Sequence, residues 1–193
     1  MCGIIGIVGK DQVADRLVDG LRRMEYRGYD SAGVCTVQDG ELVRRRAEGK
    51  LANLVTELAS NPAPGTIGIA HTRWATHGKP AERNAHPHIS NGLAVVHNGI
   101  IENHAAIRQR LQRDGVAFHT DTDTEALVQL ISAFYDITHD LEQAVRLALN
   151  EIDGTFGIVV ISKHEPDKLI AARRGSPLVL GINDGEYFIA SDA

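Results

Sequence analysis

The sequence predicts an α+β fold, because its helices and strands come in groups instead of alternating one by one along the chain. Three helices are expected in succession at 102–113, 123–134 and 140–151, and strand-like segments fill the remainder of the chain. Hydrophobic residues make up 43% of the chain and charged residues 23%, which is ordinary for a soluble globular protein. A length of 193 residues favours one domain with a substantial core.

The first elements are a strand and a helix that packs on it. Residues 3–9 are apolar and β-branched, which predicts a buried strand. Apolar residues then recur at helical spacing over 12–24, so we expect an amphipathic helix there, with Asp11 as its N-cap. A further helix is expected near 50–59, before a loop rich in Pro and Gly.

The charge balance excludes a nucleic-acid partner. Acidic residues outnumber basic ones by 25 to 20, and the net charge of −5 provides no basic surface for a phosphate backbone. The densest basic group is Arg44, Arg45 and Arg46. It follows the turn pair Asp39-Gly40, which predicts a hairpin, so we expect these arginines on a solvated strand.

The remaining elements lead to the segments that carry polar groups. Residues 67–70 and 92–96 predict central strands, each followed at once by a polar cluster. Gly115 ends the first of the three successive helices, and Thr122 with Glu125 forms a capping box at the start of the second. Four strands separated by Pro or Gly turns then predict an antiparallel meander, TFGIVVIS, KLIAARR, PLVLGI and EYFIAS.

The cysteines and the amino terminus indicate a cytoplasmic protein. Cys2 and Cys35 are too few for a disulfide framework and show no CxxC spacing, and we expect Cys35 in the core. The start MCGIIGIVGK lacks the basic region of a signal peptide, and its apolar run is too short for a membrane span. Because the chain stops at Ala193, directly after a strand pattern, we expect it to be part of a longer protein.

A cysteine in the second position can be a nucleophile with its own base. Removal of Met1 would leave a thiol and a free α-amine on Cys2. The ordinary pKa of an α-amine is about 7.7 to 8.0, so the amine can accept the thiol proton near neutral pH. The alternative is that Cys2 is only a small buried residue.

Donors for an oxyanion are expected in the segment VVHNGIIEN at 95–103. The Asn98 side-chain amide and the Gly99 main-chain N–H are the donors that a tetrahedral oxyanion requires, and glycine permits close approach. The alternative is that Asn98-Gly99 forms a tight turn.

Groups that could hold an amino acid follow a strand in the segment HTRWATHG, which places Arg73, Trp74, Thr76 and His77 in a loop. Arg73 could bind a carboxylate through two hydrogen bonds, or form a surface ion pair. Trp74 could close over a site as a lid, or pack on the core. Asp123 lies in the first turn of a helix, where it could bind an ammonium group or simply oppose the helix dipole.

We expect no metal and no other cofactor. The chain has nine histidines, including His86, His88, His97 and His104, but no carboxylate or cysteine stands at ligand spacing beside them, and HExxH is absent. The glycine-rich start also lacks the spacing of a phosphate-binding loop.

Several segments taken together resemble the class II glutamine amidotransferases, which are N-terminal nucleophile hydrolases. The resemblance covers nearly the whole chain in the expected order. The branch of the family that it matches best, through YRGYDSAG and HTRWATHG, is that of the glutamine:fructose-6-phosphate aminotransferases. The segments are MCGIIGIVG, YRGYDSAG (26–33), HTRWATHG (71–78), NAHPH (84–88), VVHNGIIEN (95–103), TDTE (122–125), GSPLVLG (175–181) and FIASD (188–192).

The resemblance implies a four-layer αββα sandwich and a glutaminase domain over residues 1–193, shortened at its C-terminal end. It implies L-glutamine as the substrate and no cofactor. In the full-length enzyme, sugar-isomerase domains that this sequence lacks would use the ammonia to convert fructose 6-phosphate to glucosamine 6-phosphate. That enzyme is expected to be a homo-oligomer without a membrane or nucleic-acid partner.

The resemblance also assigns roles to individual residues. Cys2 would be the nucleophile, and Asn98 with the Gly99 N–H would form the oxyanion hole. Arg73 would hold the α-carboxylate of glutamine, and Asp123 its α-amine. Residues that shape or close the pocket would be Trp74, Thr76 and His77.

Two alternative functions remain open at this stage. One is a non-catalytic module that senses glutamine, in which Met1 stays in place and the pocket only binds. The other is a metal-dependent hydrolase built on the histidines.

Overall fold

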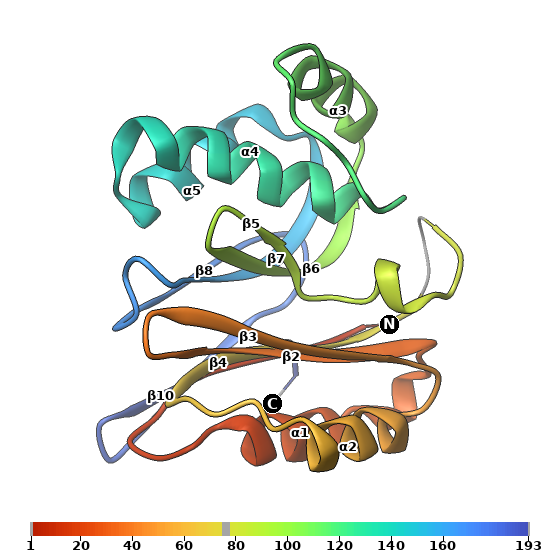
Figure 1. Ribbon diagram of the computed structural model, residues 1–193, viewed down its shortest axis with the longest axis vertical. Helices are drawn as coiled ribbons and strands as arrows, with labels where there is room; N and C mark the ends of the chain where they lie inside the picture. The colour runs from red at the N-terminus through yellow and green to blue at the C-terminus, as the bar shows by residue number, and fades with distance from the viewer. Residues whose placement is uncertain (1, 75–77, 193) are drawn as a thin grey trace.

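The protein has two helical layers on the outside and two sheets between them (Figure 1). The structure is a computed structural model that describes residues 2–74 and 78–192. Helices α1 and α2 cover the larger sheet, and α4 and α5 cover the smaller one. The α+β prediction is therefore confirmed, together with the αββα layering that the resemblance implied. The helices are α1 (Ala14–Arg23), α2 (Leu51–Ser60), α3 (His104–Arg113), α4 (Asp123–Thr138) and α5 (Leu141–Glu151).

The larger sheet is antiparallel throughout, with the strand order β3-β2-β4-β1-β10-β9. Its central strands are β1 and β4, as their apolar sequences predict. The strands are β1 (Gly3–Val8), β2 (Ser31–Gln38), β3 (Glu41–Glu48), β4 (Ile67–Arg73), β9 (Val179–Asn183) and β10 (Glu186–Ala190).

The smaller sheet has the order β5-β6-β7-β8 and is also antiparallel. Its longest strands, β6 and β7, lie at its centre and face the larger sheet. The strands are β5 (His88–Ser90), β6 (Leu93–Ile101), β7 (Gly154–Ser162) and β8 (Leu169–Arg174).

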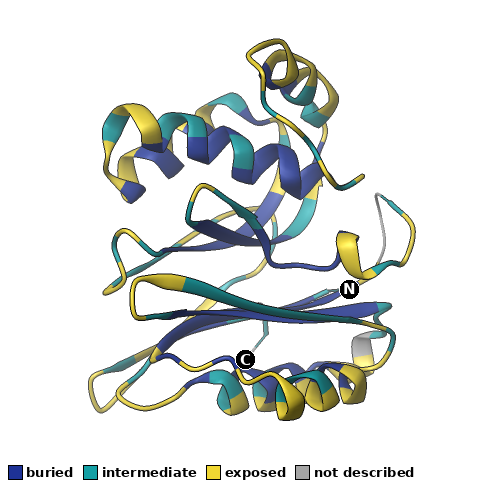
Figure 2. Ribbon diagram, in the orientation of Figure 1, coloured by how far each residue is buried: buried dark blue, intermediate teal, exposed yellow. Residues whose placement is uncertain are grey.

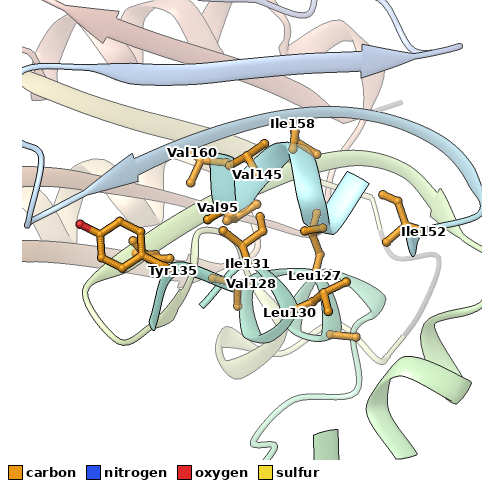
Figure 3. Close-up of a cluster of buried hydrophobic side chains, with 14 of the residues drawn as sticks. Val95, Leu127, Val128, Leu130, Ile131, Tyr135, Val145, Ile152, Ile158 and Val160 are labelled. Carbon is orange, nitrogen blue, oxygen red and sulfur yellow. The ribbon is translucent and has the colours of Figure 1, made fainter. Parts of the chain in front are cut away.

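Three apolar clusters hold the layers together: one between α1, α2 and the larger sheet, one between the sheets, and one between the smaller sheet, α4 and α5. Figure 3 shows the last of these, in which Leu127 and Ile131 of α4 gather with Val95 and Ile158 of the sheet. Each such buried side chain contributes roughly 1.5 to 3 kcal/mol. The outer faces of α1 and α2 are exposed (Figure 2). None of the helices in the described ranges combines the length and the hydropathy that a membrane-spanning helix requires.

Some predictions about local structure are wrong. The last four strands do not form one meander, because the segment 175–178 crosses from one sheet to the other. As a result β7 and β8 belong to the smaller sheet, and β9 and β10 to the larger one. The N-cap of α1 is Val13, without a side-chain hydrogen bond, and not Asp11. The capping residue Thr122 of α4 is confirmed, since its hydroxyl accepts a hydrogen bond from the Glu125 N–H. The reciprocal half of the capping box is wrong, because the Thr122 N–H donates to the Thr120 hydroxyl and the Glu125 carboxylate accepts from the N–H groups of His119 and Thr120.

The β2–β3 hairpin turns at Asp39 and Gly40, as predicted, with φ angles of 51° and 75°. Its arginines are more buried than a solvated strand would require. Arg44 donates a hydrogen bond to the carbonyl of Pro87, and Arg46 donates to the carbonyls of Arg83 and Ala85. Burial lowers the pKa of Arg46 to about 10. These two arginines thus attach the segment before β5 to the larger sheet.

Candidate active site

The candidate site is a cavity of about 420 Å³ between the ends of β4 and β6 and the start of α4. Such concave pockets with a few polar groups are typical of small-molecule sites. Six residues singled out from the sequence line it, and two others, Thr76 and His77, lie outside the described residues. The six are Cys2, Arg73, Trp74, Asn98, Gly99 and Asp123.

Cys2 precedes β1 and is partly buried at the wall of this cavity. The main-chain N–H of Trp74 donates a hydrogen bond to the Cys2 Sγ at 3.1 Å. Burial raises the pKa of the Cys2 thiol, although the Trp74 N–H acts in the opposite direction. Because the thiol is protonated at neutral pH, it needs a base to become a nucleophile.

Asn98 and Gly99 do not form the tight turn that was the alternative, because both lie within β6, opposite Gly157 and Phe156 of β7. Gly99 has a φ of 123°, and a Cβ there would lie 2.1 Å from the carbonyl oxygen of Thr155. Only glycine fits this conformation and this close approach. The Asn98 side chain bridges the two sheets.

The Asn98 amide has a partner on each side. Its Nδ2 donates a hydrogen bond to the main-chain carbonyl of Cys2 at 3.0 Å. Its Oδ1 lies 2.9 Å from the Nε2 of His71 on β4. The Nδ2 group is thus held on the same side as the candidate nucleophile, which is the arrangement an oxyanion donor requires.

Arg73 is the last residue of β4, so its predicted place in a loop is wrong, and at 3% exposure it is not part of a surface ion pair. Its Nη2 donates to the carbonyl of Gly78 at 2.8 Å, and its Nη1 lies 3.5 Å from the Asp30 carboxylate. A buried guanidinium at the wall of a pocket is suited to a carboxylate ligand.

Asp123 is the first residue of α4 and is 4% exposed. Its Oδ2 accepts a hydrogen bond from the Ile101 N–H at 2.9 Å, which fixes the carboxylate at the end of β6. Among the described residues that line the pocket, Arg73 is a buried cation and Asp123 a buried anion. This pair of charges suits the carboxylate and ammonium groups of a free amino acid.

Trp74 is 55% exposed, so the alternative that it packs on the core is wrong. Its ring lies over Gly28, where a Cβ would come within 2.5 Å of a ring carbon. Gly28 of the YRGYDSAG segment thus provides the space for this ring. Whether Trp74 closes over a ligand remains a prediction.

A buried group of histidines lies at the site. It includes His71, which the sequence did not single out, and it does not include His104, which the sequence did. His71 stacks on His86 with ring centroids 4.1 Å apart, and His86 meets His88 edge-on at 4.8 Å. His104 lies elsewhere and contacts the carbonyl of Ile101. Among the residues that the structure describes, no group of three or more His, Cys, Asp or Glu residues could hold a metal ion.

Burial keeps these imidazoles neutral. It lowers the pKa of His71 to about 3, and it lowers the pKa values of His86 and His88 well below their ordinary range. The sequence reasoning missed His71 as a site residue. Its position two residues before Arg73 on a strand, and hence on the same face, was the available signal.

Ser176 and Pro177 also line the cavity and were not among the candidate site residues. The Ser176 hydroxyl donates a weak hydrogen bond to the Asn98 carbonyl at 3.4 Å. Both residues belong to the GSPLVLG segment, where the chain crosses between the sheets, so only the tertiary structure brings them to the site.

The chain is similar to known enzymes along its whole length. It is 56% identical to the isomerizing glutamine–fructose-6-phosphate aminotransferase of Brucella suis and 55% identical to that of Zymomonas mobilis. Each match covers 100% of this chain and 32% of the relative, so the chain spans about a third of the length of these curated relatives.

Solved structures show the same fold. The glutamine phosphoribosylpyrophosphate amidotransferase of B. subtilis superposes with a TM-score of 0.83 at 28% identity, over 98% of this chain and 42% of that one. A class II glutamine aminotransferase domain protein of Silicibacter pomeroyi shares the fold at 14% identity and a TM-score of 0.66, over 100% and 89% of the two chains.

A family model described as a glutamine amidotransferase domain matches residues 71–193. The matched part begins at His71, within β4, and therefore includes Arg73 at the end of that strand and the whole of β6, which carries Asn98. Because it makes up more than half of the chain, the protein belongs to the glutamine amidotransferase domain family.

Proposed function

We propose that the protein hydrolyses L-glutamine to glutamate and ammonia through a thioester on Cys2. The observation that carries this proposal is that one cavity brings Cys2 together with two oxyanion donors, Asn98 and Gly99. The same cavity holds two groups of opposite charge, Arg73 and Asp123. The family membership and the similarity to the aminotransferases support the same reaction.

Substrate binding would use the two buried charges. The α-carboxylate of glutamine pairs with Arg73, and its α-ammonium group pairs with Asp123. The side-chain amide is then directed toward Cys2. Trp74 excludes water from the bound substrate. The resemblance to the family also assigns Thr76 and His77 to substrate binding.

The first half-reaction forms a carbon–sulfur bond. After loss of Met1, the α-amine of Cys2 takes the thiol proton, and the thiolate attacks the amide carbon of glutamine. The negative charge that develops on the amide oxygen is stabilised by the Asn98 Nδ2–H and the Gly99 N–H. The carbon–nitrogen bond then breaks, the α-ammonium group returns the proton to the leaving nitrogen, and ammonia departs.

The second half-reaction restores the enzyme. The α-amine takes a proton from a water molecule, which attacks the carbonyl carbon of the thioester. The same two donors stabilise the second tetrahedral oxyanion. The carbon–sulfur bond breaks, the sulfur recovers its proton from the α-ammonium group, and glutamate is released.

In the full-length protein, the proposed partners are sugar-isomerase domains in the same chain, which use the ammonia to make glucosamine 6-phosphate from fructose 6-phosphate. The names of the curated relatives and their greater length support this division. Residues 1–193 form the glutaminase domain in this proposal and produce no amino sugar alone. The full enzyme would be a homo-oligomer in the cytoplasm, a reducing compartment suited to two unpaired cysteines.

Intact mass and glutamate release test the proposal together. We expect active preparations to have lost the mass of Met1, and Cys2→Ala to abolish both glutamate release and labelling by diazo-oxo-norleucine, a glutamine-like electrophile. Retained Met1 with glutamine binding and no turnover would favour the sensing module instead. Stoichiometric zinc, with activity lost to a chelator, would favour the metal-dependent hydrolase.

A further inference from the structure

His71 and Asn98 come from different sheets and meet in the layer between them. On β4, Ile69 points into the cluster between the sheets, and His71 follows two residues later on the same face. On β6, Val96 points into the same cluster, and Asn98 follows two residues later. His71 and Asn98 therefore continue the two rows of apolar side chains that face each other. The Nε2 of His71 lies 2.9 Å from the Oδ1 of Asn98.

The direction of this hydrogen bond follows from the other partner of Asn98. Because the Asn98 Nδ2 donates to the carbonyl of Cys2, its Oδ1 must be the atom that faces His71. A carboxamide oxygen can only accept, so the His71 Nε2 must carry the proton and donate it. The imidazole is therefore the Nε2–H tautomer.

The ring of His71 is held by its surroundings as well. His86 stacks on it, with an angle of 18° between the ring planes. Gly33 of β2 pairs with His71, and a Cβ on Gly33 would lie 2.1 Å from the carbonyl oxygen of His86. The absence of a side chain at Gly33 thus lets the segment that carries His86 lie against the sheet and cover the His71 ring.

We infer that His71 is a positioning residue, whose Nε2–H holds the Asn98 amide so that its Nδ2 group faces the oxyanion formed at Cys2. This inference rests on the proposed function. Without the donor at His71, the amide can rotate by a half turn and present its oxygen to the oxyanion, which repels the developing negative charge. A buried ring of fixed tautomer prevents that rotation.

The variant His71→Phe keeps an aromatic ring but removes the donor. In the purified protein with Cys2 as its first residue, we expect kcat for glutamate release to fall on the order of ten- to a hundredfold, with KM for glutamine within about threefold. His88→Gln is the matched control, because it also removes a buried imidazole of the same group. The His88 imidazole contacts Thr122 and not Asn98. Its kcat should stay within about threefold of wild type.

A double-mutant cycle separates positioning from packing. If His71 acts through Asn98, then His71→Phe should lower kcat by less than about threefold in the Asn98→Ala background. Losses that multiply in the double variant would overturn the inference, as would equal losses in His71→Phe and His88→Gln. If Asn98→Ala alone retains wild-type turnover, the oxyanion assignment fails; if it loses turnover while His71→Phe does not, only the present inference fails.

A second pair of variants covers the case in which His71→Phe does not fold. A glutamine amide can reach the position of the imidazole Nε2, whereas an asparagine amide reaches that of Nδ1. We expect His71→Gln to retain most of the wild-type kcat and His71→Asn to lose it, with unchanged binding of glutamate, measured by calorimetry, showing that both variants are folded. The reverse order, or equal kcat values, would contradict the inference.

Discussion

The main-chain N–H of Trp74 donates a hydrogen bond to the Sγ of Cys2 at 3.1 Å. Trp74 directly follows β4, so the end of that strand places this donor beside the candidate nucleophile. The contact opposes the effect of burial, which still raises the pKa of the thiol above its ordinary value of 9.0. Cys2 is therefore poised beside an N–H donor but is not a thiolate by itself, so its reactivity depends on a base.

That dependence predicts how Cys2 reacts in a chain that retains Met1. Alkylation by iodoacetamide should increase about tenfold per pH unit between pH 7 and 9, because only the thiolate reacts and its fraction is still rising. A rate that levels off near pH 7 would show a lowered thiol pKa and contradict the structure. Mass spectrometry of the labelled peptide separates Cys2 from Cys35, whose burial raises its pKa to about 12.

Asn98→Ala removes one oxyanion donor. We expect kcat to fall by about 10² to 10³, while the binding of glutamate changes little. Asn91→Ala is a matched control, because Asn91 bonds Asp136 on the surface, away from the cavity. A kcat near wild type in Asn98→Ala would remove this residue from the mechanism.

Arg73→Lys keeps the positive charge but loses the two-pronged geometry. We expect KM for glutamine to rise about ten- to a hundredfold, with a smaller change in kcat, because a hydrogen bond to a charged group contributes roughly 1.5 to 3 kcal/mol. Steady-state kinetics measure this directly. The exchange Arg22→Lys, at an exposed ion pair with Asp19, should leave both constants unchanged.

Gly99→Ala tests the strand geometry. The substitution combines a positive φ of 123° with a Cβ placed 2.1 Å from the Thr155 oxygen, so we expect a loss of about 2 to 5 kcal/mol in the free energy of unfolding. Gly115→Ala shares a positive φ of 90° but meets nothing within 4 Å, so it should cost only about 1 kcal/mol. Urea denaturation compares the two, and equal losses would contradict the contact.

Acid should destabilise the protein below about pH 6.5. The unfolded histidines bind protons near the ordinary pKa of 6.5, whereas folded His71 stays neutral down to about pH 3, and His86 and His88 remain neutral well below 6.5. The free energy of unfolding therefore falls as pH drops through this window, by up to about 1.4 kcal/mol per pH unit for each histidine.

The pH dependence of urea unfolding between pH 7 and 4 measures this effect. His88→Gln should reduce the slope of the unfolding free energy against pH by the contribution of about one proton, because it removes one of the three buried imidazoles. A stability that does not change over this range would show that the imidazoles are accessible to protons in the folded state.

Local patterns in the sequence were sufficient to predict much of the structure of this molecule. The grouping of elements predicts the α+β class, apolar periodicity places the helices, and the segments around Cys2, Arg73, Asn98 and Asp123 supply the candidate chemistry. These inferences succeed because helical period, strand alternation and turn residues act over a few neighbouring positions. The same local patterns also led to wrong interpretations, among them Arg73 in a loop and the last four strands as one meander.

Only the tertiary structure decided how the two sheets face each other. Pairing of β6 with β7 keeps Asn98 and Gly99 in a strand, and the crossing at 175–178 sends β9 and β10 to the other sheet. The contact between His71 and Asn98 depends on that arrangement, because it joins residues of different sheets. Hydrophobic burial between the layers selects one stacking of the sheets, and a pattern read along a single strand carries no information about which side chain it will meet across that layer.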